Sequence, residues 1–241
     1  NHAFAFGRLH SLIKSSNSFL MLINYMIYIC PVDKNLDKSD IELGLKLPIM
    51  ESFYTIQGEG YYSGSAAYFI RVAGCDVGCH WCDVKESWDS NIHPVISINM
   101  LVDNAVKHSK MVVITGGEPL MWNMNPLTKL LKQNGIKVHV ETSGSNTLTG
   151  SWDWICLSPK KRKLPSDEVY LRANELKVIV FNKHDLIYAE EQSKKVNKKC
   201  ILFLQPEWDK KDEMLPIIVD YIKKNDKWKI SLQTHKYLKI P

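Results

Sequence analysis

The sequence of 241 residues contains no long hydrophobic run and no large excess of charge of one sign. Its most apolar stretch, residues 19–30, is well short of the ~20 residues that a membrane-spanning helix needs. The net charge of +5 is only mildly basic, whereas nucleic-acid-binding domains carry a clustered positive surface. We therefore expect neither a membrane nor a nucleic acid as a partner.

Cysteine is also scarce, and the six cysteines lack the regular pairing of a disulfide framework. Cys30, Cys156 and Cys200 are scattered, and the last two lie in apolar runs, so we expect them to be core residues. This pattern is typical of a protein from a reducing cytoplasm.

The other three cysteines, Cys75, Cys79 and Cys82, stand within eight residues of one another, and no fourth cysteine is nearby. Thiolates bind zinc, copper(I) or iron–sulfur clusters. A [4Fe-4S] cluster on three thiolates keeps one iron open to a small molecule, much as catalytic zinc keeps an open position. The spacing therefore favours a catalytic iron–sulfur site.

Two simpler interpretations compete with the cluster. A structural zinc ion can recruit His80 or His93, although zinc sites usually combine two cysteine or histidine pairs that are far apart. The three thiols can also be core residues, but Gly74 and Gly78 are typical of a loop. Neither alternative explains the spacing as well as the cluster does.

We expect one catalytic domain, residues 47–241, preceded by an N-terminal extension, residues 1–46, which lies outside the catalytic fold. The extension is interpreted as a translated region upstream of the native start, with Met50 or an earlier codon as initiator. The basic run at 159–163 is expected to be a solvated loop.

From residue 47 onward, short β-rich runs alternate with amphipathic helical patterns, as in a parallel α/β fold. Helices are predicted over 98–106, over 215–222, and between Asn125, as the cap, and Asn134. The predicted strands are 50–57, 67–73, 111–115, 138–141, 154–157, 176–181, 200–204 and 229–232.

Several predicted strands run directly into a polar segment. These segments begin at Thr115, Glu141, Ser158, Gln205 and Gln233, and the cysteine loop follows a strand in the same way. Parallel α/β folds bind ligands at the carboxyl ends of their strands. We therefore expect the segments and the cysteine loop to converge on one face.

Together, the cysteine loop and Thr-Gly-Gly-Glu-Pro at 115–119 resemble the radical S-adenosylmethionine (SAM) superfamily. Within it, the chain resembles the 7-carboxy-7-deazaguanine synthase family from about residue 47 to its end, at residues 53–60, 69–71, 82–83, 158–160 and 233–241. The resemblance implies an open, partial (βα) barrel of the radical SAM type with parallel strands, assembled as a homodimer.

The same resemblance implies conversion of 6-carboxy-5,6,7,8-tetrahydropterin to 7-carboxy-7-deazaguanine with release of ammonia, a step toward queuosine and other deazapurines. The implied cofactors are a [4Fe-4S] cluster on the three cysteines, SAM and Mg2+, and the implied partner is a one-electron donor such as flavodoxin. A glycyl-radical-enzyme activase, which needs a protein-docking surface, and a zinc-stapled binding module are the alternatives.

The family's SAM site maps onto positions near the cysteine loop and after the later strands. At Gly116 and Gly117, the lack of a Cβ would permit close approach to the methionine moiety of SAM. The remaining SAM contacts are implied for Trp81, Cys82, Asp83, Ser158, Pro159, Lys160, Gln205, Pro206, Glu207 and Trp208.

The implied substrate site begins with a pair of charged residues. Arg71 offers a planar fork for the pterin carboxylate, and Glu59 can accept paired N–H bonds from the guanidine-like edge. Glu141 is the third expected catalytic residue. Ile56, Gln57, Gly58, Thr115 and the carboxylate of Pro241, at the end of a tail that folds back in this family, are the other expected contacts.

Val84 departs from the family pattern. Many members have threonine at this position, where the hydroxyl helps to bind Mg2+ alongside the substrate. An aliphatic side chain cannot ligate a cation that demands oxygen. Magnesium is therefore in doubt, or it is held by substrate oxygens, water and another group such as Asp83.

Overall fold

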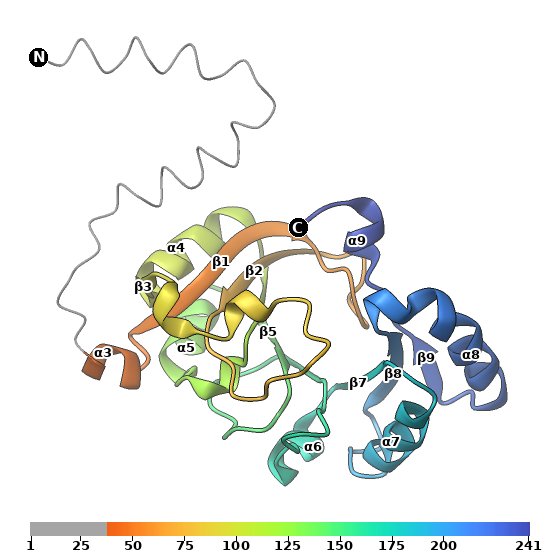
Figure 1. Cartoon of the computed structure of the whole chain (residues 1–241). Coiled ribbons are helices and arrows are strands. Elements are labelled where there is room, and N and C mark those ends of the chain that lie inside the picture. The colour runs from red at the N-terminus through yellow and green to blue at the C-terminus, as the bar shows by residue number, and fades with distance from the viewer. Residues whose placement is uncertain (1–37) are drawn as a thin grey trace, which may run out of the picture. The chain divides into compact units, whose positions relative to one another are not determined.

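The computed structural model describes residues 38–241, and Figure 1 colours their helices and strands along the chain. The strands form one sheet with the order β3-β1-β2-β4-β5-β6-β7-β8-β9. Their bounds are β1 Lys46–Ile56, β2 Ala66–Val72, β3 Val95–Ser97, β4 Met111–Gly116, β5 Lys137–Thr142, β6 Trp154–Leu157, β7 Glu175–Val180, β8 Ile201–Pro206 and β9 Trp228–Ile230.

From β2 to β9 every neighbouring pair of strands is parallel, which confirms the predicted open α/β fold. The exception is β1, which pairs antiparallel with both β2 and β3. Residues 57–65 join β1 to β2, and so short a connection makes a hairpin rather than the crossover that a parallel pair needs. The sequence analysis did not foresee β3.

The helices of the described chain are α3 Lys38–Glu42, α4 Ile98–His108, α5 Asn125–Gln133, α6 Asp167–Arg172, α7 His184–Ser193, α8 Lys211–Lys224 and α9 Thr234–Leu238. Short 3-10 turns lie at η2 Lys85–Ser87, η3 Ser90–Ile92, η4 Pro119–Met121 and η5 Trp208–Lys210. Asn125 is not the cap of α5, as predicted, but its first residue. The cap is Met124, because the Asn125 side chain instead accepts the Gly150 N–H at 2.8 Å.

Two apolar clusters hold the helices against the sheet. Leu101 of α4 and Leu131 of α5 pack with Ile70 of β2, and Met214 of α8 packs with Leu204 of β8. Side chains alternate between the two faces of a strand. Because these helices use one face, the alternate residues of the strands line the other, and Figure 1 shows the sheet curving around that side.

The fold already includes residues before the predicted domain boundary. Lys46 pairs with Ser97 of β3, and the Asn123 side chain donates to the Leu43 carbonyl at 3.2 Å. Residues 1–37, with Cys30 and the apolar stretch 19–30, lie outside the described residues, so their assignment to an extension stays a prediction. None of the described helices has the length and apolarity needed to cross a membrane.

Candidate active site

The face of the sheet opposite the helices carries polar side chains in register. In β5, Val140 points into the core whereas Glu141 does not, and in β7 Lys177 sits between the core residues Leu176 and Val178. Neighbouring strands align these positions, since Arg71 pairs with Thr115, and Glu141 pairs with Cys156. The alternation thus builds one polar wall from separate strands.

A cavity of about 390 Å³ lies over the carboxyl ends of these strands. All of the residues predicted to bind the cluster, SAM or the pterin line this cavity except Pro159, which is buried in the chain. The predicted convergence of the polar segments and the cysteine loop on one face is therefore observed.

The thiols of Cys75, Cys79 and Cys82 are partly buried and all line the cavity. Burial raises the pKa of the Cys75 and Cys79 thiols. Within residues 38–241 no group of three histidine, cysteine or carboxylate side chains is gathered tightly enough for a single metal ion. His93, a candidate zinc ligand, instead places Nε2 2.7 Å from the Glu86 carbonyl oxygen.

Gly116 and Gly117 serve a packing role that the sequence analysis did not predict. A Cβ on Gly116, which has φ +131°, would lie 2.1 Å from the Val72 carbonyl oxygen, and one on Gly117 would lie 2.1 Å from that of Gly74. The Gly117 N–H donates to Val72 O at 2.9 Å. Glycine is thus required to bring the end of β4 against the base of the cysteine loop.

Glu118, the acidic residue of the Gly-Gly-Glu-Pro turn, is almost completely buried. Its carboxylate accepts the backbone N–H groups of Leu120 at 3.0 Å and Ser143 at 2.8 Å, and it also accepts the Thr142 hydroxyl. Buried carboxylates persist where such donors satisfy them. Glu118 therefore ties the turn after β4 to the end of β5.

The basic run at 159–163 is only in part the solvated loop that the sequence suggested, because Lys161 and Arg162 are exposed whereas Pro159 is buried. Arg162 donates to the Gly78 carbonyl, and Lys163 pairs with Asp76. Two side chains of the basic run therefore bind the cysteine loop and stabilise its position. Lys161 pairs with Asp185 at 2.5 Å, outside the cavity lining.

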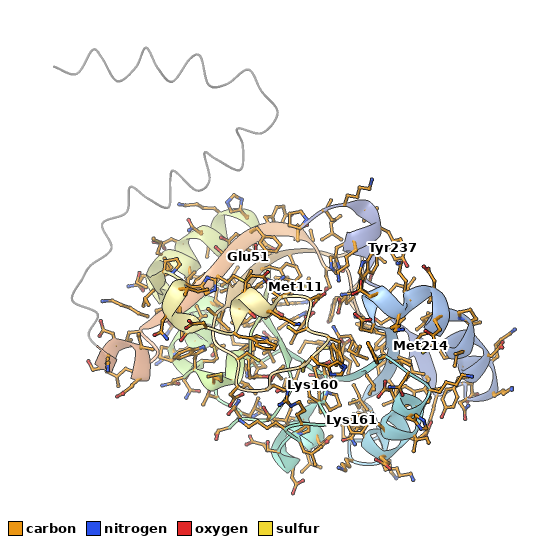
Figure 2. All side chains as sticks on the ribbon, viewed as in Figure 1. Glu51, Met111, Lys160, Lys161, Met214 and Tyr237 are labelled. Carbon is orange, nitrogen blue, oxygen red and sulfur yellow. The ribbon has the colours of Figure 1, made fainter. Side chains whose placement is uncertain are left out.

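Lys160, the neighbour of Lys161 in Figure 2, lines the cavity. Its Nζ donates to the carbonyl and the hydroxyl of Ser158, both at 2.6 Å, and lies 5.6 Å from the Trp81 ring centroid. Burial lowers the pKa of Lys160.

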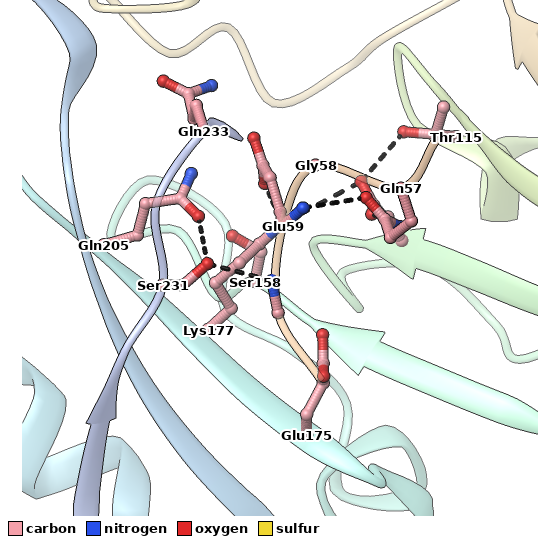
Figure 3. A network of polar contacts seen from close by, with 12 residues as sticks. Gln57, Gly58, Glu59, Thr115, Ser158, Glu175, Lys177, Gln205, Ser231 and Gln233 are labelled. Atoms are coloured by element: carbon pink, nitrogen blue, oxygen red, sulfur yellow. Dashed lines mark hydrogen bonds and ion pairs between the residues drawn. The ribbon is translucent and has the colours of Figure 1, made fainter. Parts of the chain in front are cut away.

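Lys177 lies among carboxylates that line the cavity, and Figure 3 shows it in the surrounding network of polar side chains. Its Nζ pairs with the Glu59 carboxylate and lies 3.9 Å from Glu141 Oε2. The Gln57 amide joins the same network, because Nε2 donates to Glu141 Oε1 at 2.9 Å and Oε1 accepts the Glu59 N–H at 3.0 Å. Thr115 Oγ1 lies 3.4 Å from Glu141 Oε2.

The pair of Lys177 and Glu59 stays charged although it is buried. Burial acts to raise the pKa of Glu59, but the ammonium of Lys177 outweighs this and brings that pKa down to about 2. Burial acts to lower the pKa of Lys177, but the anionic groups around it hold that pKa well above its usual value. Glu59 is therefore an ionised acceptor at neutral pH.

The sequence analysis missed Lys177. A signal was present, because Glu175 and Lys177 occupy alternate positions of an otherwise apolar strand and so share a face.

Arg71 lines the part of the cavity formed by β1 and β2, together with Phe53 and Phe69. The rings of these two residues are stacked, with their centroids 5.7 Å apart. Arg71 Nε donates to Glu51 Oε1 at 2.6 Å across the β1–β2 pair. A guanidinium has five N–H donors, and this contact uses one of them. Arg71 is thus oriented by Glu51 and retains donors for a second anion.

The C-terminal tail closes another side of the cavity. The backbone N–H and hydroxyl of Thr234 both donate to the Gly58 carbonyl, at 3.0 and 2.9 Å. A Cβ on Gly58 would lie 2.2 Å from His235 Nδ1, so only glycine permits this contact. Thr55 Oγ1 donates to the Pro241 carbonyl at 3.3 Å, and Pro241 lines the cavity.

The residues at the family's magnesium position do not fit that ion. The Val84 side chain offers no oxygen, and its carbonyl oxygen already accepts the Ser87 N–H at 3.1 Å and the Ser87 hydroxyl at 2.7 Å. Mg2+ demands oxygen ligands in octahedral geometry. The neighbouring carboxylate of Asp83 is in an ion pair with Lys236, at 2.6 Å between Oδ2 and Nζ.

Comparison with known proteins gives a consistent result. The family model of the radical SAM superfamily matches residues 69–156. A 7-carboxy-7-deazaguanine synthase of Flavobacterium psychrophilum is 63% identical over 201 residues, which cover 83% of this chain and 96% of that protein. The synthase of the same name from Escherichia coli K12 is 35% identical and covers 81% of this chain and 100% of that protein.

The fold agrees with these relationships. The crystal structure of QueE from Escherichia coli superposes with a TM-score of 0.72 at 30% identity and covers 82% of this chain and 98% of that one. Sequence, fold and the cysteine loop lead to the same assignment: the chain belongs to the 7-carboxy-7-deazaguanine synthase family of the radical SAM superfamily.

Proposed function

We propose that the protein is a 7-carboxy-7-deazaguanine synthase, which converts 6-carboxy-5,6,7,8-tetrahydropterin to 7-carboxy-7-deazaguanine with loss of ammonia, in deazapurine and queuosine biosynthesis. The observation that carries the proposal is one cavity of about 390 Å³ in which three thiols, a paired arginine, an ionised carboxylate and Pro241 meet. A protein-docking activase would also need the cluster and SAM, but it would have no need of a carboxylate clamp such as Arg71 in the same cavity.

The residues around the thiols fit a cluster and SAM. Cys75, Cys79 and Cys82 would hold the [4Fe-4S] cluster, and when bound, the cluster and SAM supply one-electron chemistry that removes a hydrogen atom from the substrate. Arg162 and Lys163 hold the cysteine loop in place. The remaining proposed SAM contacts are Trp81, Asp83, Gly117, Ser158, Lys160, Gln205, Pro206, Glu207 and Trp208, which all line the cavity.

The opposite part of the cavity suits a carboxylated pterin. Arg71 faces it with donors that match a carboxylate, and Glu59, kept ionised by Lys177, is an acceptor for the guanidine-like edge. Gln57 and Glu141 hold each other in place at 2.9 Å. Ile56, Gly58, Thr115 and Pro241 complete the proposed substrate wall.

Anaerobic turnover tests the proposed function. Protein reconstituted with iron and sulfide is incubated with SAM, a chemical reductant, Mg2+ and carboxytetrahydropterin, and the product is identified by mass. We expect the mass of the deazaguanine acid and one ammonia released per product. Formation of 5′-deoxyadenosine without any deazaguanine acid would show a radical SAM enzyme with a different substrate.

Replacing Arg71 with alanine is expected to weaken binding of the pterin by about 1.5 to 3 kcal/mol, the usual value of a hydrogen bond to a charged group. The cluster should be unaffected, because Arg71 contacts Glu51 rather than the cysteine loop. The measurement is the dissociation constant of the pterin together with the iron content. Arg172→Ala is the matched control, since Arg172 makes an exposed pair with Glu168 on α6. Equal affinity in the two variants would exclude the carboxylate role of Arg71.

A tag attached after Pro241 is expected to lower kcat/KM for the pterin by about tenfold or more, equivalent to ~1.4 kcal/mol. The extra residues would displace the terminus that Thr55 holds beside the cavity. The same tag at the N-terminal end is the control. Equal kcat/KM for the two tagged proteins would show that the tail has no role in the site.

The family resemblance also supports three proposals about the setting of the enzyme. These are a homodimer, a one-electron donor such as flavodoxin, and a location in the cytoplasm. Sedimentation of the reconstituted protein measures the first, and turnover with reduced flavodoxin in place of the chemical reductant measures the second.

A further inference from the structure

Beside Val84, the cavity wall carries a side-chain cation that is held from two sides. Lys236 Nζ lies 2.6 Å from Asp83 Oδ2 and 4.9 Å from the centroid of the Trp208 ring. All four of these residues line the cavity. The ammonium of Lys236 is thus fixed between the cysteine loop and the segment that follows β8.

The Asp83 carboxylate is committed to this arrangement. Oδ2 also accepts a hydrogen bond from Gln233 Nε2 at 3.4 Å. A metal ion at this point would have to compete with an ammonium for its carboxylate ligand, with no side-chain oxygen available from Val84.

We propose that Lys236 joins Arg71 in binding the substrate carboxylate and takes the position where related enzymes use a threonine-held Mg2+, so that this protein binds its substrate without a divalent metal. The inference rests on the proposed function. An ammonium has three N–H donors, so Lys236 can donate to Asp83 and to a second anion at the same time. Lys236 is a substrate-binding residue in this assignment.

The test is equilibrium dialysis with two stable probes, 6-carboxypterin and pterin, which differ in the carboxylate alone. Cluster-loaded protein with SAM is measured in the presence of a metal chelator and again with saturating Mg2+. We expect the dissociation constant of 6-carboxypterin to be the same under both conditions. Calorimetric titration of Mg2+ into the complex should likewise show no binding heat.

Substitutions at three positions distinguish the loss of the Lys236 ammonium from a general change in the cavity. Lys236→Gln is expected to weaken binding of 6-carboxypterin about tenfold or more, or ~1.4 kcal/mol, and to leave pterin binding unchanged. Lys211→Gln is the matched control, because Lys211 stacks on the same Trp208 ring, at 4.6 Å, but lies outside the cavity lining. Val84→Thr is expected to create a Mg2+ dependence that the unmodified protein lacks.

A loss of 6-carboxypterin affinity of about tenfold on chelation in the unmodified protein would overturn the inference, and this arm needs no variant. An equal loss of affinity for both probes in Lys236→Gln would also overturn it, because the effect would then not concern the carboxylate. Turnover separates this failure from that of the proposed function. Deazaguanine acid formed only when Mg2+ is present would reject the role of Lys236 alone, whereas no product in either condition would reject both.

Discussion

Cys79→Ala protein is expected to emerge from anaerobic reconstitution colourless, without bound iron, and unable to cleave SAM. Three thiols line the cavity, and the loss of one leaves two protein ligands for a four-iron cluster. Iron analysis, visible absorption and 5′-deoxyadenosine formation measure the three consequences separately. The loss of the cluster should be complete rather than partial, because the contacts of Arg162 and Lys163 with the cysteine loop cannot replace an iron ligand.

Cys200→Ala is the matched control for this loss. Cys200 is partly buried, burial raises its pKa to about 12, and it lies immediately before β8, outside the cavity lining. Its replacement should leave the iron content unchanged. A Cys79→Ala protein that keeps the full iron content of the Cys200→Ala protein would contradict the assignment of Cys79 as a ligand, and zinc in place of iron in both would restore the structural-zinc alternative.

The parts of the fold that the sequence predicted are those governed by local pattern. The strands from 67–73 to 229–232 were placed within a few residues, because apolar runs and polar segments alternate along the chain. The strand at 95–97 was missed because its three residues lead directly into α4, whose first residue is Ile98. The antiparallel direction of β1 depends on the short connection to β2, which the repeated βα pattern obscured.

Within the site, short motifs predicted which residues converge but not how those residues contact one another. Gly116 and Gly117 were assigned to SAM, yet their missing Cβ atoms are first required by the carbonyls of Val72 and Gly74. Lys163 was assigned to solvent, yet it pairs with Asp76, 87 residues away. Contacts of this kind depend on how the sheet curves, and curvature leaves no local signature in the sequence.

Three charged side chains on the cavity wall are held by an opposite charge from another segment. Arg71 is oriented by Glu51, Asp83 by Lys236, and Glu59 by Lys177. Pairing allows a small cavity to hold several charges, because an unpaired charge away from water is costly. The cavity can therefore combine apolar side chains, such as the Phe53 and Phe69 rings, with charged groups whose charge is compensated.

Replacing Lys177 with methionine is expected to have the largest effect among these pairs, since its side chain is only 4% exposed. Removing one partner of a buried pair typically costs about 3 to 5 kcal/mol, because the other charge is left uncompensated. In the variant, burial dominates the pKa of Glu59, and buried carboxyls without a counter-charge can titrate as high as about pH 8 to 9. Substrate affinity should then fall as the pH is lowered from about 9 to about 6.

The unmodified protein should show no such pH dependence from Glu59, whose pKa of about 2 keeps it ionised throughout that range. Its contribution to stability is present above the usual value of 4.5 and is lost only as the pH falls toward 2. In Lys177→Met the pH dependence of stability has the opposite sign. The pKa of Glu59 is then raised in the folded state, so that ionisation of Glu59 destabilises the fold, and this loss of stability is largest at high pH.

The double variant Lys177→Met with Glu59→Gln distinguishes two roles of Lys177, stabilising the fold and holding Glu59 ionised for the substrate. It removes both charges, so the free energy of unfolding should largely recover, whereas pterin affinity should stay low and independent of pH because the acceptor is gone. Lys229→Met, on the exposed end of β9, is the control for the loss of a lysine from the sheet. Recovery of pterin affinity in the double variant would show that Lys177 supports the fold alone and that Glu59 does not receive the substrate.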